Sequence, residues 1–475
     1  MADERFADHL EYPRGEAPSP DGAHDGHAGG AACGDLVRLS VRVEGERVAE
    51  ATFDAEGCGA VRAAASAAVE LVQGAHVLDA ARIGSPAIAA ALGGLLPSKV
   101  HAADLASDAL AWALGRAVAA DGTAEAIPTR TLVAMSGGVD SAVAALCCAP
   151  EDGDARAAHD VVAVTLELWR DPENDGDRSC CSAQAVRTAR TLAHGMGLPH
   201  FTIDLREPFR AGVVQPWLDE HAEGLTPNPC VRCNGHVRLD AMLDLADRIG
   251  AAHLATGHYA RTTADGLLRL AADPAKDQAY MLSALSRDAL LRMRFPLGEM
   301  TKPQVRERAA AAGLSVAQTP DSQDLCFLAG TGKAAFLAKH GTARDRPGEI
   351  VDRGGRPVGR HEGAHHFTVG QRRGIGVGGT GEPIYVVATD ARANTVTVGP
   401  REALDTTTVP VRALRLHRPS GDVDAVKLRY RSKPVACTLE GSSIVLADPA
   451  SAPAPGQTAC LLAGDVVVGS ATIVR

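Results

Sequence analysis

A short glycine turn between an apolar run and a helix-like segment constrains the fold more than any other feature. The run Thr131 to Met135 precedes the turn Ser-Gly-Gly-Val-Asp-Ser, and small residues continue from there to Ala149. This pattern predicts a buried strand, a tight turn and a helix start, where backbone amides point at a bound anion. Asp140 in the turn is a candidate ligand for a magnesium ion between phosphates. The turn lacks a Gly-Lys-Ser/Thr ending, so it is not a Walker-type loop, and a turn that serves only packing is the alternative.

Length and composition indicate a multidomain globular enzyme. A chain of 475 residues predicts about three or four domains, and 45% apolar with 22% charged residues is typical of globular proteins. No apolar stretch approaches the ~18 residues of a membrane span, and the charged residues among positions 3–8 do not match a secretory signal. The eleven cysteines favour redox, sulfur or metal chemistry over structural disulfides. We therefore expect a cytoplasmic enzyme with no membrane partner.

The net charge of −10 is concentrated in the first part of the chain. Residues 1–125 contain 19 acidic and 9 basic side chains, which accounts for the whole excess. Residues 351–475 contain 15 basic and 11 acidic side chains. We therefore expect a basic surface that binds a nucleic-acid backbone only locally, toward the C-terminus.

Periodicity and composition divide the chain into six regions. Beyond a linker, strand-like and helix-like stretches alternate, which predicts an α/β parallel sheet with ligands at the carboxyl ends of its strands. Short alternating runs near the C-terminus predict a β-barrel. The expected strands are 131–135, 161–169, 200–205 and 253–256, and the expected helices are 139–149, 182–196, 234–249 and 303–312. The predicted regions are 1–30 (flexible leader), 31–118 (small α+β domain), 119–129 (linker), 130–340 (α/β domain), 341–405 (central small β-rich domain) and 406–475 (C-terminal β-barrel).

The small α+β domain carries residue types that bind metals. Cys33 and Cys58 each lie beside glycine, and His101 comes just before a helix-like stretch. Thiolate and imidazole ligands of this kind suit zinc or an iron–sulfur cluster. Cysteines that are simply buried small hydrophobic residues are the alternative.

Residues 31–118 resemble the U-type iron–sulfur assembly scaffold. That family places three cysteines and an aspartate around its metal or cluster, which implies a site at Cys33, Asp35 and Cys58, with His101 matching the family's histidine. The third cysteine should follow this histidine, but the chain has Ala102 there. In the family the missing cysteine is a cluster ligand and the usual sulfur acceptor. A residual metal site and a purely docking role are therefore both open.

Three further cysteines lie in loop-like segments of the α/β domain. Residues 226–234 have the sequence Thr-Pro-Asn-Pro-Cys-Val-Arg-Cys-Asn, in which two prolines stiffen a Cys-x-x-Cys segment. Cys233 is expected where a helix begins, a position that favours a reactive thiolate. Cys326 lies in a polar loop farther along the chain. Zinc would need another ligand pair besides this Cys-x-x-Cys segment. The three thiols Cys230, Cys233 and Cys326 instead suit one of two arrangements, a dithiol plus a sulfur carrier or a three-thiolate cluster with one open iron.

Residues 130–475 resemble the tRNA-specific 2-thiouridylase family along their whole length. The matching signatures include 135–141, 226–229 (Thr-Pro-Asn-Pro), 255–259 (Ala-Thr-Gly-His-Tyr), 276–278 (Lys-Asp-Gln), 321–323 (Asp-Ser-Gln) and 370–374 (Gly-Gln-Arg-Arg-Gly). The resemblance implies ATP binding by Ala134, Met135, Ser136, Gly137, Gly138, Val139, Asp140, Ser141, Leu166 and Gly257. It implies contacts to the target base or the tRNA by Asn228, Pro229, Cys230, Lys276, Asp277, Gln278, Arg429 and Tyr430.

The two catalytic cysteines also follow from the resemblance. Cys233 matches the family's nucleophile, and Cys326 matches the cysteine that carries a persulfide. Cys230 occupies a position that is aspartate in some members, so it is a bystander, a base-site residue or a cluster ligand.

The family chemistry is ATP-dependent sulfur insertion at carbon 2 of a wobble uridine in tRNA. ATP with Mg²⁺ adenylates the oxygen, and the persulfide then replaces it, leaving a disulfide between Cys233 and Cys326. A cysteine desulfurase or a sulfur-relay protein is the expected donor. A [4Fe–4S] cluster on Cys230, Cys233 and Cys326 is the alternative sulfur carrier. An ATP-dependent amide-forming ligase, and an iron–sulfur assembly or interaction protein, are the other function classes that remain open.

Overall fold

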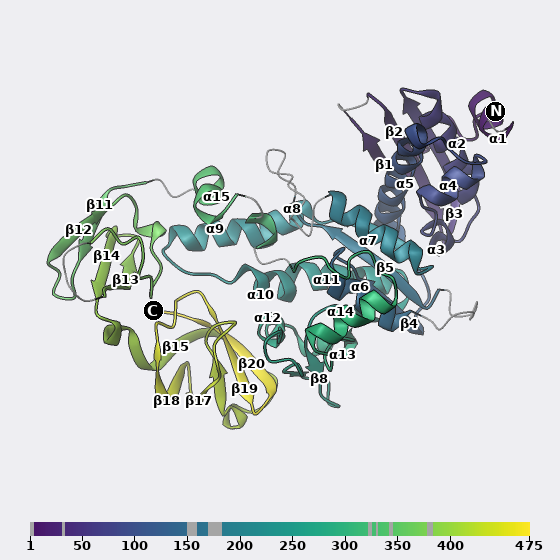
Figure 1. Cartoon of the computed structure of the whole chain (residues 1–475). Helices are drawn as coiled ribbons and strands as arrows, with labels where there is room; N and C mark the ends of the chain where they lie inside the picture. Colours follow the sequence, from purple (N-terminus) through teal and green to yellow (C-terminus); the bar gives the residue numbers. More distant parts are fainter. Residues whose placement is uncertain are drawn as a thin grey trace. The chain divides into compact units, whose positions relative to one another are not determined.

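The protein is described by a computed structural model that divides into two compact units (Figure 1). Unit 1 comprises Met1–Arg206, Ala241–His258 and Arg292–Gln323, and unit 2 comprises Glu207–Asp240, Tyr259–Leu291 and Asp324–Arg475. Within the described part of the chain, no helix is both long and apolar enough to cross a membrane. The structure describes residues 4–30, 34–149, 159–169, 183–321, 325–328, 331–341, 345–377 and 383–475.

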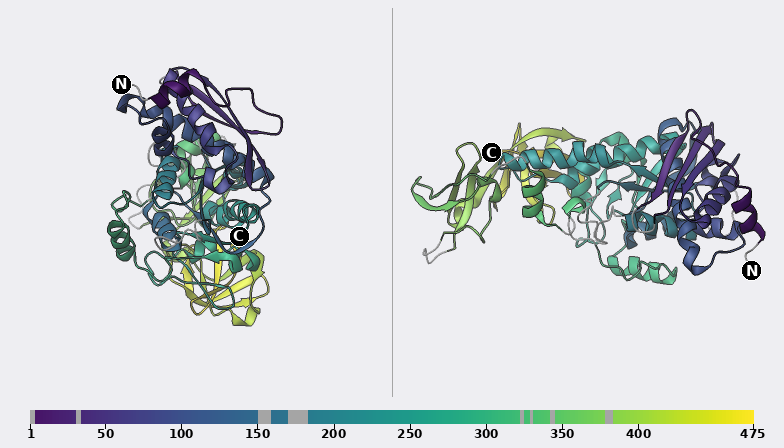
Figure 2. Two further views of the ribbon diagram at one scale, coloured as in Figure 1. Left: turned by 90° about the vertical axis from the view of Figure 1, so that its right-hand side faces the viewer. Right: turned by 90° about the horizontal axis from the view of Figure 1, so that it is seen from above.

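The front part of unit 1 is a three-stranded antiparallel sheet covered by helices, which confirms the predicted α+β domain. Val37, Leu39 and Val41 alternate along the middle strand, and each is at most 2% exposed because it faces the core. The strands are β1 (His24–Gly29), β2 (Leu36–Glu44) and β3 (Arg47–Glu56), in the order β1–β2–β3. The helices are α1 (Glu4–Glu11), α2 (Gly59–Val72), α3 (Val77–Ala80), α4 (Ser85–Ala91), η1 (Pro97–Lys99) and α5 (Val100–Asp121). Helix α5 lies along β1 and β2 (Figures 1 and 2).

Residues 4–30 are ordered, so the prediction of a flexible leader is wrong. Helix α1 packs on α2, and the His9 Nδ1 atom lies 2.9 Å from the Ser66 Oγ atom. Strand β1 pairs with β2 over its full length. The order of this segment comes from contacts with the domain that follows it, and local apolar periodicity does not report such contacts.

The centre of unit 1 is a five-stranded sheet in the order β10–β7–β4–β5–β6, with every neighbouring pair parallel. This confirms the predicted α/β parallel sheet. Its elements are β4 (Ile127–Ala134), α6 (Val139–Cys148), β5 (Val161–Glu167), α7 (Ala183–Gly195), β6 (His200–Asp204), α11 (Leu239–Arg248), β7 (Ala251–Thr256), β10 (Met293–Arg294) and α14 (Lys302–Ala311). Helix α6 packs on β4 and β7, and α7 packs on β5 and β6. Because α5 continues to Asp121 and β4 starts at Ile127, the connection is shorter than the expected linker 119–129.

The front helix α5 also covers β6, the edge strand of the parallel sheet. The two backbones approach so closely that a Cβ atom on Gly115 would lie 2.0 Å from the Thr202 carbonyl oxygen. Only glycine fits such an approach. Beside this contact, the His200 amide donates a hydrogen bond of 3.0 Å to the Ala81 carbonyl oxygen of the front part. The front domain therefore packs directly against β6 of the parallel sheet.

An ion-pair network reinforces this junction. Asp108 of α5 pairs with Arg187 and Arg190 of α7, and the Arg187 Nε atom donates to the Asp108 Oδ2 atom at 2.8 Å. Asp108 and Arg190 are both buried. Breaking a buried pair leaves an uncompensated charge, so these contacts oppose separation of α5 from α7.

Unit 2 begins with helical segments that lead to two β structures. The 259–291 part adds a two-stranded hairpin of β8 (Arg261–Thr262) and β9 (Leu268–Arg269). The helical elements are α8 (Arg206–Phe209), η3 (Arg210–Val214), α9 (Gln215–Ala222), α10 (Pro229–Cys233), η4 (Asn234–Arg238), α12 (Ala279–Leu282), α13 (Arg287–Arg292), η5 (Cys326–Leu328) and α15 (Lys333–His340).

The first β structure of unit 2 is a four-stranded sheet in the order β12–β11–β14–β13. It has a core of its own, in which Ile350, Val386 and Val396 have no exposed surface. Its elements are β11 (Gly348–Val351), β12 (Pro357–His361), η6 (Ala364–His366), β13 (Tyr385–Asp390), β14 (Thr395–Gly399) and η7 (Arg401–Leu404).

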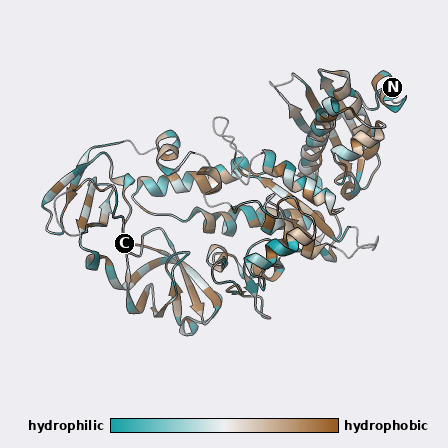
Figure 3. Ribbon diagram, viewed as in Figure 1, coloured by the Kyte–Doolittle hydropathy of each residue, from teal (hydrophilic) through white to brown (hydrophobic). Residues whose placement is uncertain are grey.

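The second β structure is a closed six-stranded barrel, as predicted. The strands follow the order β15–β18–β17–β16–β19–β20, and β15 also pairs with β20 to close the barrel, while β9 pairs with β20 outside it. Hydrophobic and hydrophilic residues alternate along these strands (Figure 3). The barrel elements are β15 (Asp405–Leu416), η8 (Ser420–Asp422), β16 (Ala425–Lys427), β17 (Val435–Glu440), β18 (Ser443–Ser451), β19 (Thr458–Ala463) and β20 (Val466–Ile473).

The contact between α5 and β6 predicts an unusual response to a Gly-to-Ala substitution. Alanine normally stabilises a helix relative to glycine by about 1 kcal/mol. Gly115→Ala should instead destabilise unit 1 by about 1–3 kcal/mol, because its Cβ atom meets backbone that cannot move away. Urea unfolding and hydrogen exchange of the α5 amides would measure the effect.

Gly195→Ala is the matched control, because Gly195 ends α7 and a Cβ atom added there would meet no other atom within 4 Å. It should leave stability unchanged or raise it. Equal responses of the two variants would contradict the close packing of α5 on β6.

Candidate functional site

The turn after β4 lies at the switch point of the parallel sheet. From β4 the sheet adds β5 and β6 on one side and β7 and β10 on the other. The carboxyl ends of β4 and β7, at Ala134 and Thr256, therefore border the crevice where open α/β sheets bind ligands. Leu166 lies near the carboxyl end of β5, the other neighbour of β4. The three strand ends predicted to meet a nucleotide are thus adjacent in the sheet.

Ser141 fixes the shape of the turn. Its Oγ atom donates a hydrogen bond to the Gly138 carbonyl oxygen and accepts one from the Ser136 amide, each at 3.0 Å. Gly138 is the N-cap of α6, and no side chain in the described part of the chain caps this helix. The N-terminus of α6, with the positive end of its helix dipole, therefore points to the mouth of the turn, a position that favours a bound anion.

Gly257 brings the end of β7 against the first turn of α6. A Cβ atom at Gly257 would lie 2.8 Å from the Asp140 carbonyl carbon and 2.8 Å from the Ser141 nitrogen. A larger residue would push the end of β7 away from the first turn of α6. This explains physically why glycine occupies the second strand end, a role for which the sequence alone offers only a weak signal.

The structure adds a residue that sequence reasoning missed, Lys302 at the first position of α14. Its Nζ atom lies 2.6 Å from the Asp140 Oδ1 atom and 2.8 Å from the Asp321 Oδ1 atom, and the side chain is buried. Arg306 also contacts Asp321, at 3.0 Å. Lysine is unfavourable at a helix N-terminus because of the helix dipole, and that mismatch is the signal that would have singled it out. Asp140, the predicted magnesium ligand, is thus paired with a cation.

The Cys-x-x-Cys segment lies in a helix that begins earlier than predicted. The Asn228 Oδ1 atom accepts hydrogen bonds from the Cys230 and Val231 amides at 3.1 and 3.2 Å, and Pro229 occupies the first helical position. The cap and the proline start α10 at residue 229, so Cys230 lies in the first turn and Cys233 ends α10. The expectation that the helix begins at Cys233 is wrong. The electrostatic advantage of a helix N-terminus applies to Cys230.

Cys326 is held through its neighbour. Phe327 is 4% exposed, and its ring centroid lies 5.2 Å from those of both Trp217 and Phe336. This aromatic cluster fixes the short helix η5, while Cys326 itself is half-buried. Cys233 is 7% exposed. Both predicted catalytic cysteines lie in unit 2.

Two of the side chains predicted to contact tRNA have partners within unit 2. Asp277 and Lys427 form a buried ion pair with an Oδ2–Nζ distance of 3.1 Å. The Gln278 Oε1 atom accepts a hydrogen bond of 2.9 Å from the Tyr259 amide. These contacts position the 276–278 segment, and Lys276 is the half-exposed basic residue that it presents.

The second pair of predicted tRNA contacts lies at the barrel. The Tyr430 ring lies 6.2 Å from the Tyr280 ring of α12, and burial raises the pKa of the Tyr430 hydroxyl. The Arg429 guanidinium donates to the Ala452 carbonyl oxygen. Tyr430 therefore packs next to α12, and Arg429 is held by the backbone at Ala452.

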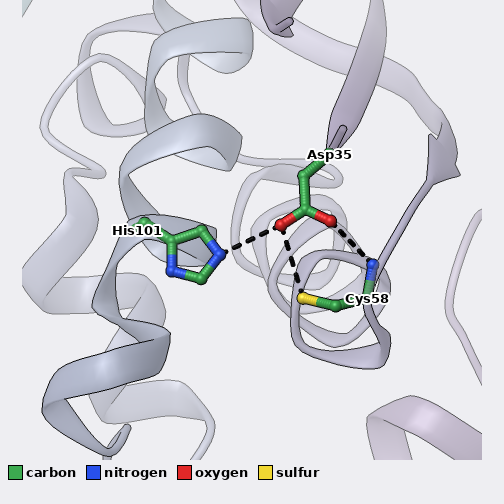
Figure 4. Close-up of side chains that lie close together, drawn as sticks. All are labelled: Asp35, Cys58 and His101. Carbon is green, nitrogen blue, oxygen red and sulfur yellow. Dashed lines mark hydrogen bonds and ion pairs between the residues drawn. The ribbon is translucent and has the colours of Figure 1, made fainter. Parts of the chain in front are cut away.

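The front domain brings three metal-ligand types together (Figure 4). The Asp35 Oδ2 atom lies 3.0 Å from the His101 Nε2 atom and 3.5 Å from the Cys58 Sγ atom. The Cys58 amide donates to Asp35 Oδ1 at 2.7 Å, and this bond, with help from His101, lowers the pKa of the Asp35 carboxyl. Ala102, where the third thiol is missing, is fully buried beside His101. The remaining predicted ligand, Cys33, lies outside the described residues.

Three groups among the described residues have donor atoms within 4.8 Å of one another. They are Asp35–Cys58–His101, His76–Asp79–His159 and Asp345–His365–His366. The first includes a thiol, and its donor set of sulfur, nitrogen and oxygen fits zinc. Cys230, Cys233 and Cys326 do not form such a single-ion group in this part of the chain.

Family models match four consecutive parts of the chain. A NifU-like N terminal domain matches residues 2–119, and a tRNA methyl transferase HUP domain matches residues 129–330. A tRNA methyl transferase PRC-barrel domain matches residues 334–400, and an aminomethyltransferase beta-barrel domain matches residues 418–473.

Curated relatives align with nearly the whole chain or with its last three quarters. The bifunctional protein NifU/MnmA of Rubrobacter xylanophilus is 43% identical and covers 99% of this chain and 98% of its own length. The tRNA-specific 2-thiouridylase MnmA proteins of Salinispora tropica and Salinispora arenicola are 43% and 44% identical, and each covers 73% of this chain and 99% of its own length. The chain therefore belongs to the bifunctional NifU/MnmA family, in which a NifU-like domain is joined to a tRNA-specific 2-thiouridylase.

Proposed function

We propose that this protein is a tRNA-uridine 2-sulfurtransferase that replaces the oxygen on carbon 2 of a wobble uridine with sulfur. The observation that carries the proposal is the 43–44% identity to 2-thiouridylases over 99% of their length. An amide-forming ligase would have no need of the two cysteines at positions 233 and 326. The substrate is tRNA, and the co-substrate is ATP.

The first step activates the oxygen as a leaving group. The uridine oxygen attacks the α-phosphate of ATP, an O–P bond forms, and pyrophosphate leaves. The amides at the start of α6 and the Lys302 ammonium lie where they would stabilise the phosphate charge. Mg²⁺ would supply further charge neutralisation, with the Asp140 carboxylate as its candidate ligand.

The second step delivers sulfur. The terminal sulfur of a persulfide on Cys326 attacks carbon 2, and AMP leaves with the electrons of the broken C–O bond. The Cys233 thiolate then attacks the Cys326 sulfur, which releases the thiolated base and leaves a Cys233–Cys326 disulfide for an external dithiol to reduce. A cysteine desulfurase or a sulfur-relay protein loads the persulfide.

The alternative sulfur carrier is a [4Fe–4S] cluster ligated by Cys230, Cys233 and Cys326. Its three thiolates would leave one iron open for hydrosulfide. Anaerobic purification with iron analysis separates the two routes, because a colourless, iron-free and fully active enzyme excludes the cluster.

Removal of either catalytic thiol should abolish sulfur transfer. Cys233→Ala and Cys326→Ala are each expected to lower the rate of 2-thiouridine formation by about 10³-fold or more, as expected for loss of a covalent catalyst. Mass spectrometry of nucleosides from reacted tRNA measures the product.

Cys437→Ala is the matched control, because Cys437 in the barrel has the same 7% exposure as Cys233. It should retain thiolation. Full 2-thiouridine formation by both Cys233→Ala and Cys326→Ala would contradict the proposed roles of the two thiols, and wild-type protein that forms no 2-thiouridine would leave the ligase as the alternative.

Lys302→Met should impair the ATP step and leave sulfur loading intact. The substitution keeps most of the side-chain length but removes the cation beside Asp140. We expect tRNA-dependent pyrophosphate release to fall about 100-fold, the size expected when one preorganised electrostatic contact is lost. The persulfide on Cys326, measured by mass spectrometry, should form normally; loss of both signals would instead indicate a misfolded variant.

The front domain is proposed to hold a zinc ion at Asp35, Cys58 and His101, the group in Figure 4. The geometry supports this, because the donor atoms of the three side chains lie within 4.8 Å of one another. Cys33, the fourth ligand that the resemblance implies, lies outside the described residues. Because Ala102 replaces the family's third cysteine, the site suits docking of a sulfur donor better than assembly of a cluster.

The full chain should bind Co²⁺ with a thiolate-to-metal charge-transfer band, since Cys58 supplies the sulfur. Asp35→Ala and His101→Ala should weaken binding at least about tenfold. His27→Ala, at an exposed position on β1, should not. An unchanged band in both site variants would remove the proposed zinc site while leaving the thiouridylase proposal intact.

A further inference from the structure

The barrel and the α9–α10 segment of unit 2 enclose a pocket of about 280 Å³. One wall is formed by Asn228, Pro229 and Arg232, next to Cys230. Arg412, Ala413 and Arg415 of β15 form another part of the lining. The pocket therefore adjoins the helix that carries two cysteines of the proposed sulfur-transfer site.

The backbone of β15 is distorted at this wall. Its pairing with β20 shifts register between Arg412 and Arg415, and Ala413 adopts a φ of 51°. A residue other than glycine in the left-handed region is strained, and bulges of this kind re-aim side chains beside functional sites. Here the bulge brings both arginines to the same pocket, although a regular strand alternates its side chains between faces.

The two arginines give the pocket an unbalanced positive charge. In the described part of the chain, neither guanidinium of Arg412 or Arg415 has a hydrogen-bond or ion-pair partner. The third cation, Arg232, is paired at 3.2 Å with Glu220, the acidic residue of the lining, which also interacts electrostatically with Arg412. Three arginines against one glutamate leave the lining with a net positive charge. His236 adds no fixed charge, because burial and then Arg415 lower the pKa of its imidazole.

The chemistry of the pocket matches a nucleotide unit. Guanidinium groups bind phosphate oxygens in a bidentate manner, and most contacts between proteins and nucleic acids go to the phosphate backbone. Val213, Trp217 and Val231 supply an apolar part of the lining for a ribose or base. A carboxylate ligand would satisfy the arginines but would leave this apolar part without an occupant.

We infer that this pocket binds the RNA segment flanking the target uridine, with its phosphodiester groups on Arg412 and Arg415. The inference rests on the proposed function and identifies which residues fix the RNA register next to α10. Both arginines act as positioning residues, because they hold the backbone and leave the reacting atoms to other groups.

The test compares tRNA binding by the full chain and by Arg412→Ala/Arg415→Ala, at several salt concentrations and without ATP. We expect the double variant to bind tRNA about tenfold or more weakly, and the salt dependence of log K to fall by roughly 1.4–1.8, the amount for two lost phosphate contacts. At saturating tRNA its kcat should be retained, so the loss appears in KM.

Two further variants keep the test decisive. Arg412→Lys/Arg415→Lys preserves the charge but loses the planar fork, so its salt dependence should stay near wild type while its affinity falls. Arg392→Ala/Arg401→Ala removes the same charge from exposed positions of unit 2 outside the pocket lining and should bind tRNA nearly as wild type does.

An unchanged tRNA affinity and salt dependence in the Arg412→Ala/Arg415→Ala variant overturns the inference, even where the variant binds inorganic pyrophosphate less well. A different result would contradict the proposed function, namely wild-type protein that binds tRNA but forms no 2-thiouridine. If the double variant still bound tRNA more weakly than that wild-type protein, the RNA-binding pocket would stand without the proposed function.

Discussion

Lys302 balances the charges on which the turn after β4 depends. Asp140 lies in the first turn of α6 and Asp321 lies beyond α14, and a single buried ammonium bridges the two carboxylates. A lysine buried without partners would be very costly, and two carboxylates sharing a site without a cation would repel each other. The ion pairs therefore fix the distance between the turn and the segment that leads toward Cys326. A polyphosphate bound at the turn, as proposed above, would compete with Asp140 and Asp321 for the same ammonium.

The sequence could predict those parts of the fold whose signal is local. Apolar runs located four of the five parallel strands to within a few residues but missed the short strand β10, and alternating runs located the C-terminal barrel. The order of residues 4–30 was not predictable in this way, because α1 and β1 are held by the hydrogen bonds and packing of a neighbouring domain. The cysteines carry no signal for the start of α10, because the Asn228 cap and Pro229 determine where this helix begins.

The candidate site shows the same division. Motifs identified the turn, Gly257 and the loop cysteines, since each carries a recognisable residue type at a fixed spacing. The sequence did not predict Lys302 or the arginines of β15, because their surroundings are formed by residues far apart in the chain. Asp140, for example, is 162 positions from Lys302. A register shift in a strand, such as the one at Ala413, leaves no trace in the pattern of apolar residues. A motif can also contain residues whose side chains maintain the fold, and Asp277 and Gln278 are examples.

The contact of α5 with β6 has a consequence for how the front domain and the parallel sheet depend on each other. An edge strand with unsatisfied backbone groups invites pairing with other chains. Here Ala81 and α5 cover the β6 edge of the parallel sheet. The front domain therefore protects this edge from pairing with strands of other chains. Cleavage of the chain near residue 125 and separation of the two pieces would expose the β6 edge on the C-terminal piece. It would also expose the small-residue face of α5 on the N-terminal piece. The front domain and the parallel sheet therefore depend on each other within unit 1, because separating them would expose a new surface on each.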